Sequence, residues 1–210
     1  MTHVLMLLSS PRGEASLSTK VAKALGERLT AELHATITVR DLASELLPHV
    51  DPAYTFGRFV AADERTPAQA AAAGIAQTLV DELKAADIVV IGASMINFGP
   101  SSTLKTWVDY VVWPGVTMVP SHDGPKGLIT GKKVYLAVAS GGIHSDGPMA
   151  PNDMLVRYLK QILGFIGITD VEVIRAEAQS FGPEEAQKGA NAAFSRVAAL
   201  NLADRLLASA

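Results

Sequence analysis

The sequence of 210 residues predicts an α/β fold, in which helices cover both faces of one parallel β-sheet in a doubly wound arrangement. First, the strand-like apolar runs, such as VLMLL at 4–8 and IVVIG at 88–92, are nearly continuous rather than alternating. Such strands are buried on both faces, which is typical of parallel sheets. Second, amphipathic helical segments separate the apolar runs, as in successive βαβ units.

Five strands and five helices are expected, and they alternate along the chain. The expected strands are 4–8, 36–39, 87–92, 133–140 and 170–175, and the expected helices are 18–33, 66–85, 101–113, 152–164 and 183–208. Pro67 after Thr66, and Pro183 before two glutamates, are favourable helix starts. Right-handed crossovers between these strands lead to a flavodoxin-like, five-stranded sheet with strand order 2-1-3-4-5.

Residues 1–210 are expected to form one domain, because the length suits a single core and no low-complexity linker interrupts it. Two connections, 41–65 and 114–131, are longer than usual and carry several prolines. Long structureless connections in a compact domain usually form lids or binding loops. We therefore expect both connections to contribute to a ligand pocket.

The composition excludes several classes of function. A net charge of −3 disfavours a nucleic-acid partner and an electrostatic membrane anchor, and no apolar run approaches the roughly 20 residues that span a bilayer. The chain has no cysteine, which excludes disulfides and thiolate sites. Its five histidines lack metal-ligand spacing, so no metal is expected. No signal-peptide pattern is present, and we expect a cytoplasmic location.

Small hydroxyl side chains crowd the connection between the first strand and the first helix. They are Ser9, Ser10, Ser16, Ser18 and Thr19. The free N–H groups of a helix start make a natural anion site, to which these hydroxyls would add donors; the alternative is that a serine only caps the helix. Because G-x-G-x-x-G and G-K-[ST] are both missing, the terminal phosphate of FMN fits better than a pyrophosphate. Arg12 and Glu14 are expected on the solvent side of this loop.

The loop after the third strand contains the stretch MINF at 95–98. The side-chain amide of Asn97 can both donate and accept hydrogen bonds, which suits the polar edge of a flavin ring. Met95 and Phe98 offer apolar surface to the flat face of such a ring. A plain turn, with Asn97 in a permissive backbone conformation, is the alternative.

The loop after the fourth strand contains Gly141, Gly142 and His144. Paired glycines let backbone N–H groups approach a ligand closely, which suits the N1 and O2 region of a flavin. His144 is interpreted either as a proton donor or as a structural residue that holds the loop.

Two other classes of protein compete with a flavin enzyme. Ser94 follows the third strand as the nucleophile of a hydrolase would, but Ile96 occupies the place of the second glycine in G-x-S-x-G. A flavodoxin-type electron carrier, or a flavin-binding module without its own substrate, is the second alternative. Carriers tend to be strongly acidic, whereas this chain carries a net charge of only −3 and two long loops.

Ordered blocks over nearly the whole chain resemble the family of FMN-dependent NADH:azoreductases and quinone reductases. The blocks are SS at 9–10, SLS at 16–18, MINF at 95–98, GLITGKK at 127–133, GGIHSDGP at 141–148 and LGFIGITDV at 163–171. The resemblance implies a flavodoxin-like fold and a homodimer with two sites at its interface, to which the loops 41–65 and 114–131 contribute. It also implies one non-covalent FMN per subunit, and ping-pong transfer of hydride from NADH or NADPH to quinones or azo compounds.

The resemblance assigns the cofactor-binding residues, and the loop sequences add candidates for the substrate pocket and for catalysis. The phosphate contacts are Ser10, Ser16, Leu17 and Ser18; the ribityl and ring contacts are Met95, Ile96, Asn97 and Phe98; and the final cofactor-binding loop is Ala139, Ser140, Gly141 and Gly142. The substrate pocket is expected to include Met118, Phe56 and Phe59, and the catalytic candidate is His144.

Four positions depart from the family's usual pattern. Ser94 replaces a proline, Ile96 and Met118 replace aromatic residues, and Ser140 replaces an arginine. Because backbone groups supply most cofactor contacts, FMN binding is expected to survive these changes. A less aromatic and less basic pocket is expected to handle bulky anionic azo dyes poorly.

Overall fold

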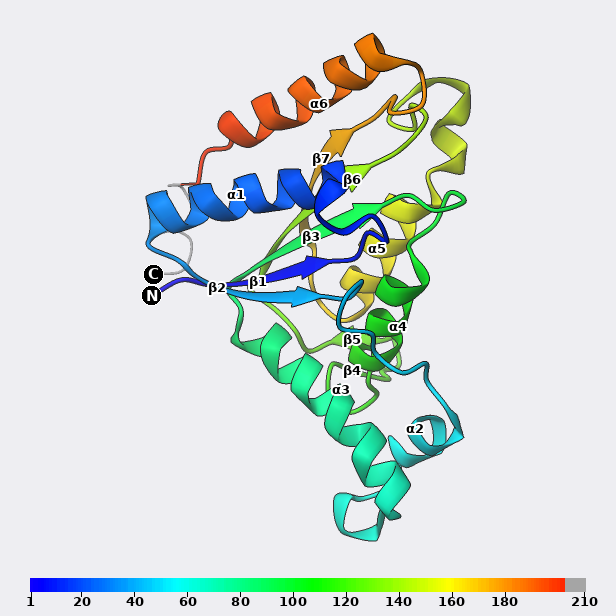
Figure 1. The fold of residues 1–210 in the computed structure, drawn as a ribbon. Helices are drawn as coiled ribbons and strands as arrows, with labels where there is room; N and C mark the ends of the chain where they lie inside the picture. Colours follow the sequence, from blue (N-terminus) through cyan, green and yellow to red (C-terminus); the bar gives the residue numbers. More distant parts are fainter. Residues whose placement is uncertain (203–210) are drawn as a thin grey trace.

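The computed structural model describes residues 1–202 of the chain, and its centre is one five-stranded β-sheet (Figure 1). From edge to edge the strands are β2 (Thr36–Asp41), β1 (His3–Leu8), β3 (Ile88–Ser94), β6 (Lys133–Ala139) and β7 (Asp170–Ala176), and all neighbours are parallel. The short strands β4 (Met118–Val119) and β5 (Lys126–Gly127) pair with each other as a separate antiparallel hairpin. When only the five strands of the main sheet are numbered along the chain, their order is therefore 2-1-3-4-5, as predicted.

Helices cover both faces of the sheet (Figure 1). On one face lie α1 (Leu17–Leu33) and α6 (Pro183–Ala198), and on the other lie α3 (Pro67–Ala85), α4 (Ser102–Val111) and α5 (Met154–Phe165). A short helix, α2 (Pro52–Gly57), packs against α3. Turns of 3₁₀ helix occupy Gly13–Ala15, Ala62–Glu64 and Gly147–Asn152. Of the helices in residues 1–202, none has the length and hydropathy needed to cross a membrane.

The sheet separates two hydrophobic cores, because alternate residues of a strand point to opposite faces. On β1, Leu5 and Leu7 belong to the core that includes side chains of α3, α4 and α5, whereas Val4 and Met6 belong to the core that includes side chains of α1 and α6. All four side chains are buried. This burial on both faces is the physical reason for the continuous apolar runs in the sequence.

Although the sequence predicts a structureless loop over 41–65, this connection contains the helix α2. Asp51 starts this helix by accepting a hydrogen bond from the Tyr54 N–H at 2.8 Å, and Pro52 takes the first helical position. The Tyr54 ring is buried against Tyr110, and its hydroxyl donates to the Tyr110 carbonyl at 2.8 Å. Burial, the main cause, raises the pKa of Tyr54 to about 12. The connection is thus fixed to α4.

The connection 114–131 forms the β4–β5 hairpin, which lies where the main strands begin. Ile129 donates its N–H to the Ile166 carbonyl at 2.8 Å, just before β7 starts. A Cβ at Gly127 would lie 2.1 Å from the Gly167 nitrogen, so only glycine allows the hairpin to approach this closely. The hairpin therefore sits at the edge of the sheet opposite to the carboxyl ends of the strands.

Several predicted boundaries shift by one or two residues, and caps explain two of them. Ser101 and Asp153 were counted as helical, but their side chains accept hydrogen bonds from the N–H groups of Leu104 and Val156 and so precede α4 and α5. The helix predicted over 183–208 ends at Ala198 in the structure. Residues 203–208 of that prediction lie outside the described residues.

Gly92 on β3 determines how closely α1 approaches the sheet. A Cβ at this position would lie 3.1 Å from the Ser18 carbonyl oxygen and 3.2 Å from the Ala22 Cβ. These distances are shorter than ordinary van der Waals contacts. The absence of a side chain at Gly92 therefore lets the first turn of α1 rest directly on the sheet.

Candidate functional site

Three loops meet in a cavity of about 490 Å³ at the carboxyl edge of the sheet, as predicted for a doubly wound fold. Its walls include seven of the predicted binding residues: Ser16, Leu17, Met95, Ile96, Ala139, Ser140 and Gly141. The rest of its lining includes the start of α6 and the segment before it. We call this space the first cavity.

The start of α1 faces the first cavity without a side-chain cap. Ser16 is the N-cap residue, but its hydroxyl accepts no hydrogen bond from a backbone N–H of the helix. Instead, the Ser16 and Ser18 hydroxyls pair with each other at 3.0 Å, and both side chains are buried. The simple capping role is therefore not what these serines perform. Free helix N–H groups and two redirectable hydroxyls suit a bound anion.

Ser9 and Ser10 have different environments although they are adjacent. The Ser9 hydroxyl donates to the Gly92 carbonyl at 3.0 Å, which joins the first loop to β3. The Ser10 hydroxyl accepts a hydrogen bond from the Arg12 N–H at 3.3 Å and so keeps its own proton for another partner. Ser10, and not Ser9, is available as a donor.

Arg12 corrects one expectation from the sequence. The sequence predicts its side chain on the solvent side of the loop, and the side chain is exposed, but it lines the first cavity together with Lys20. Neither residue forms an ion pair within the described part of the chain. Glu14, in contrast, does pair with Lys23 away from the cavity. Lys20 was missed because it lies one turn inside α1, where a lysine looks like a solvated surface residue.

The segment before α6 also lines the first cavity, although no local sequence pattern indicates it. Gln179, Ser180 and Pro183 line the first cavity from the side of β7. Ser180 donates its N–H to the Gly141 carbonyl at 3.0 Å, and a Cβ at Gly141 would lie 2.6 Å from the Ser180 hydroxyl. The topology could have indicated this segment, because it follows β7, the strand next to β6, and therefore lies at the same carboxyl-terminal edge of the sheet.

The stretch at 95–98 forms a tight turn with unusual backbone geometry. Ile96 and Gly99 exchange two backbone hydrogen bonds at 2.9 and 3.0 Å. Between them Asn97 and Phe98 both have positive φ, 46° and 72°, as in a type I′ turn. Such a φ at a phenylalanine costs about 1–3 kcal/mol, and strain of this kind often accompanies function. The plain-turn alternative thus holds in part, but the turn is strained.

The turn is attached to the next loop and borders an unsatisfied polar atom. The Met95 N–H donates to the Ala139 carbonyl at 2.8 Å. Ser94 lines the first cavity, and its hydroxyl is buried with no hydrogen-bond partner. A buried hydroxyl left unpaired is costly, so a ligand group in the cavity that pairs with Ser94 would be favoured.

His144 is buried, and its contacts define its tautomer. Its Nδ1 lies 3.3 Å from the Met149 carbonyl oxygen, which can only accept, so Nδ1 carries a proton. The neutral ring then has its lone pair on Nε2, beside Gly142, whose Cβ would lie 3.1 Å from that atom. The ring also meets Phe98 edge-on at 5.9 Å. Neutral His144 can therefore accept a proton at Nε2, and only its protonated form can donate one.

Two more cavities of at least 500 Å³ adjoin the turn at 95–98. The second cavity, of about 500 Å³, is lined by Phe98 and by the loop from Gly142 to Met149, including His144. The third cavity, of about 770 Å³, is lined by Ile96 and Asn97 together with Lys105, Arg157 and Tyr158 from α4 and α5. Burial, the main cause, raises the pKa of Tyr158 to about 12, so this phenol remains a donor at neutral pH.

The three predicted substrate-pocket residues lie apart from these cavities within one chain. Met118 is buried in the hairpin at the opposite edge of the sheet. Phe56 and Phe59 are 67% and 65% exposed on and after α2. None of the three lines the cavities described above. Within residues 1–202, no group of three or more His, Asp or Glu side chains could hold a metal ion.

The sheet is doubly wound, and the uncapped start of α1 lies at its crevice. This combination is typical of mononucleotide-binding α/β proteins. The family described as having a flavodoxin-like fold matches residues 2–200. The chain belongs to this flavodoxin-like family, and its similarity to the relatives below places it with the FMN-dependent NADH:quinone oxidoreductases.

Two relatives and one solved structure illustrate this similarity. The FMN-dependent NADH:quinone oxidoreductase 2 of Rhizobium etli is 50% identical over 201 residues, which cover 95% of this chain and 98% of the relative. The FMN-dependent NADH:quinone oxidoreductase 1 of Burkholderia lata is 50% identical over 188 residues, covering 89% and 91%. The azoreductase of Bacillus anthracis superimposes with a TM-score of 0.87 at 32% identity, covering 94% of this chain and 97% of that structure.

Proposed function

We propose that the chain is an FMN-dependent oxidoreductase that passes hydride from NADH or NADPH to quinones, azo compounds or both. The observation that carries this proposal is the buried Ser16–Ser18 hydroxyl pair at the uncapped start of α1, facing the first cavity. Relatives at 50% identity are named FMN-dependent NADH:quinone oxidoreductases. Their names support an enzyme rather than an electron carrier.

The residues of the first cavity fit FMN. The hydroxyls of Ser10, Ser16 and Ser18, with the backbone of Leu17, would hold the terminal phosphate at the start of α1. The Arg12 guanidinium supplies a positive charge at the same cavity. FMN supplies the chemistry of accepting a hydride from a nicotinamide and returning it to an acceptor.

The two other loops hold the ring end of the site. Met95 and Ile96 would border the ribityl chain, while Asn97 and Phe98 would present an amide and an aromatic surface from the strained turn. From the opposite side come the backbone groups of Ala139, Ser140, Gly141 and Gly142. His144, at the second cavity, holds or moves a proton at Nε2. One pocket receives the nicotinamide and the acceptor in turn, which gives ping-pong kinetics.

The functional unit is a homodimer of single-domain subunits. Phe56 and Phe59 are close in sequence and both expose aromatic surface, and contiguous exposed apolar surface marks sites of association. Both side chains lie on the connection 41–65, away from their own subunit's cavities. In the dimer they and the 114–131 hairpin, with Met118, complete the substrate pocket across the interface.

The decisive experiment for the proposed function is a spectrum. We expect the purified protein, after incubation with FMN and gel filtration, to retain flavin absorbance that NADH bleaches under anaerobic conditions. Addition of a quinone should restore the absorbance. A protein that retains no flavin, or retains it without bleaching by NADH or NADPH, would refute the proposal.

Substrate range is expected to follow the charge of the pocket. The Ser140 hydroxyl donates to the Gly142 carbonyl at 2.8 Å and offers no positive charge, where family members often carry arginine. We expect kcat/KM for a sulfonated azo dye to be at least about tenfold lower than for a neutral quinone, since one lost charge pair removes about 1–2 kcal/mol. Steady-state kinetics measures the ratio of kcat/KM for the dye to kcat/KM for the quinone, and Ser140→Arg should raise that ratio. Equal efficiency on both acceptors would contradict the expectation.

A further inference from the structure

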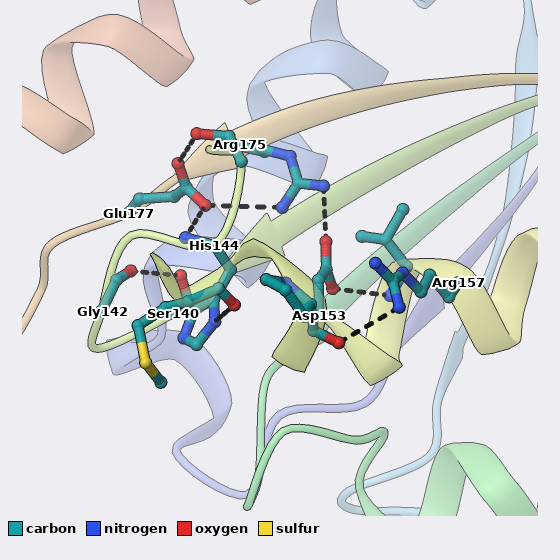
Figure 2. A network of polar contacts seen from close by, with 11 residues as sticks. Ser140, Gly142, His144, Asp153, Arg157, Arg175 and Glu177 are labelled. Carbon is teal, nitrogen blue, oxygen red and sulfur yellow. Dashed lines mark hydrogen bonds and ion pairs between the residues drawn. The ribbon is translucent and has the colours of Figure 1, made fainter. Parts of the chain in front are cut away.

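A single carboxylate after β7 holds two successive residues of the loop that carries His144 (Figure 2). One Glu177 oxygen accepts a hydrogen bond from the His144 N–H at 2.8 Å. The other accepts a hydrogen bond from the Ser145 hydroxyl at 2.6 Å. Glu177 therefore fixes both the backbone that carries the histidine and the residue that follows it.

Glu177 is itself held by a chain of charges that ends in α5 (Figure 2). The Arg175 guanidinium lies 3.4 Å from Glu177 and 2.6 Å from the Asp153 carboxylate. Asp153 also caps α5 by accepting a hydrogen bond from the Val156 N–H at 3.0 Å. Strand β7, the His144 loop and the start of α5 are thus joined through three side chains.

These three charged groups are shielded from solvent, unlike most ion pairs of a protein surface. The exposed fractions of the side chains are 13% for Glu177, 22% for Arg175 and 6% for Asp153. Shielded ions lose hydration, so they persist only where several hydrogen bonds compensate for that loss. Each member of this chain has at least two such contacts, which makes its geometry well defined.

We propose that Glu177, supported by Arg175 and Asp153, is a positioning residue that fixes the His144 loop between the first and second cavities. This inference rests on the proposed function. The loop lines the first cavity through Ser140 and Gly141 and the second through Gly142 and the residues that follow. Its position therefore determines where the His144 Nε2 stands relative to a ligand, and whether the ring keeps its edge contact with Phe98.

The variant Glu177→Gln tests the proposal because it leaves the shape of the side chain almost unchanged. Its amide keeps one oxygen for the His144 N–H but loses the charge that Arg175 needs and the second acceptor that Ser145 needs. We expect the holoenzyme to keep an FMN Kd within about threefold of the wild type, while kcat for quinone reduction falls about tenfold, because small misplacements near reacting groups are costly.

Glu172→Gln is the matched control. Glu172 lies on the same strand, and its carboxylate is also ion-paired, with Lys133 at 3.4 Å and with Arg196. It does not line any of the three cavities. The variant removes an equivalent charge pair from β7, so unchanged kcat and unchanged FMN affinity are expected.

A second readout needs no cofactor. In the protein without FMN, the side-chain ¹⁵N signals of His144 should report one tautomer protonated at Nδ1, as the Met149 contact requires. Glu177→Gln should convert this pattern into a mixture of tautomers. Ser145→Ala, which removes one loop contact and no charge, should give a smaller change of the same kind, and it serves as the deciding variant if Glu177→Gln does not fold.

The outcomes separate this inference from the proposed function. If the wild type binds no FMN, the proposed function fails, whereas the tautomer measurement still tests the positioning role. A wild-type tautomer pattern in both Glu177→Gln and Ser145→Ala would overturn the positioning role. Loss of FMN from Glu177→Gln with the tautomer unchanged would also overturn it, because Glu177 would then serve cofactor binding directly.

Discussion

Replacing both Ser16 and Ser18 by alanine is expected to weaken FMN binding by about a hundredfold. Each hydroxyl that donates to a charged group contributes about 1.5–3 kcal/mol, and roughly 1.4 kcal/mol corresponds to a factor of ten in Kd. Both hydroxyls are buried beside the first turn of α1, and each is paired with the other. Quenching of FMN fluorescence during titration with the apo-protein measures the Kd.

Ser9→Ala is the matched control for this double variant. Ser9 belongs to the same loop, but its hydroxyl is committed to the Gly92 carbonyl and is not available to a ligand. We expect a small loss of stability, about 1 kcal/mol, and no change in FMN affinity. The phosphate assignment is wrong if the Ser16 and Ser18 double variant binds FMN as tightly as the wild type does.

Gly92→Val is expected to lower both the stability of the protein and its affinity for FMN. The added side chain would press against the Ser18 carbonyl and Ala22, so α1 must move away from the sheet. Overpacking of this kind costs about 1–3 kcal/mol of unfolding free energy. Because the first turn of α1 borders the proposed phosphate site, the same displacement should raise the Kd for FMN about tenfold.

Urea unfolding and FMN titration together test this second prediction, and Gly74→Ala is its control. Gly74 lies in the middle of α3, and a Cβ there would meet no atom within 4 Å. Alanine is the better helix former by about 1 kcal/mol, so this variant should be slightly more stable and bind FMN normally. A Gly92→Val protein with wild-type stability and affinity would mean that α1 does not depend on this close contact.

The arrangement of strands and helices was predictable because burial on both faces leaves a strong mark on a sequence. VLMLL and IVVIG are apolar at every position, since alternate residues enter different cores. The helix α2 was missed because Pro48 and Pro52 suggested a loop, although Asp51 followed by Pro52 is a helix start. Its stability comes from the Tyr54 contact with α4, which no local pattern reveals.

The candidate site was predictable in part, for a topological reason. Loops that follow neighbouring parallel strands end at the same edge, so Ser16, Met95 and Gly141 were expected together and all line the first cavity. Arg12 looked solvated because charge alone does not show which way a loop side chain points. The sequence could not predict the partners of His144, since Glu177 lies 33 residues further along the chain and contacts it only through tertiary folding.

The strained turn at 95–98 has a consequence for how the pocket can change during evolution or in the laboratory. Ile96 borders the first and third cavities, Asn97 the third, and Phe98 the second. One short, rigid segment is thus the common wall of three compartments, and its backbone is locked by the paired bonds between Ile96 and Gly99. Substituting other side chains at 96 and 98 would reshape the adjoining cavities together, while the backbone of the turn stays unchanged. This turn is therefore a suitable place to select variants with new acceptor preferences.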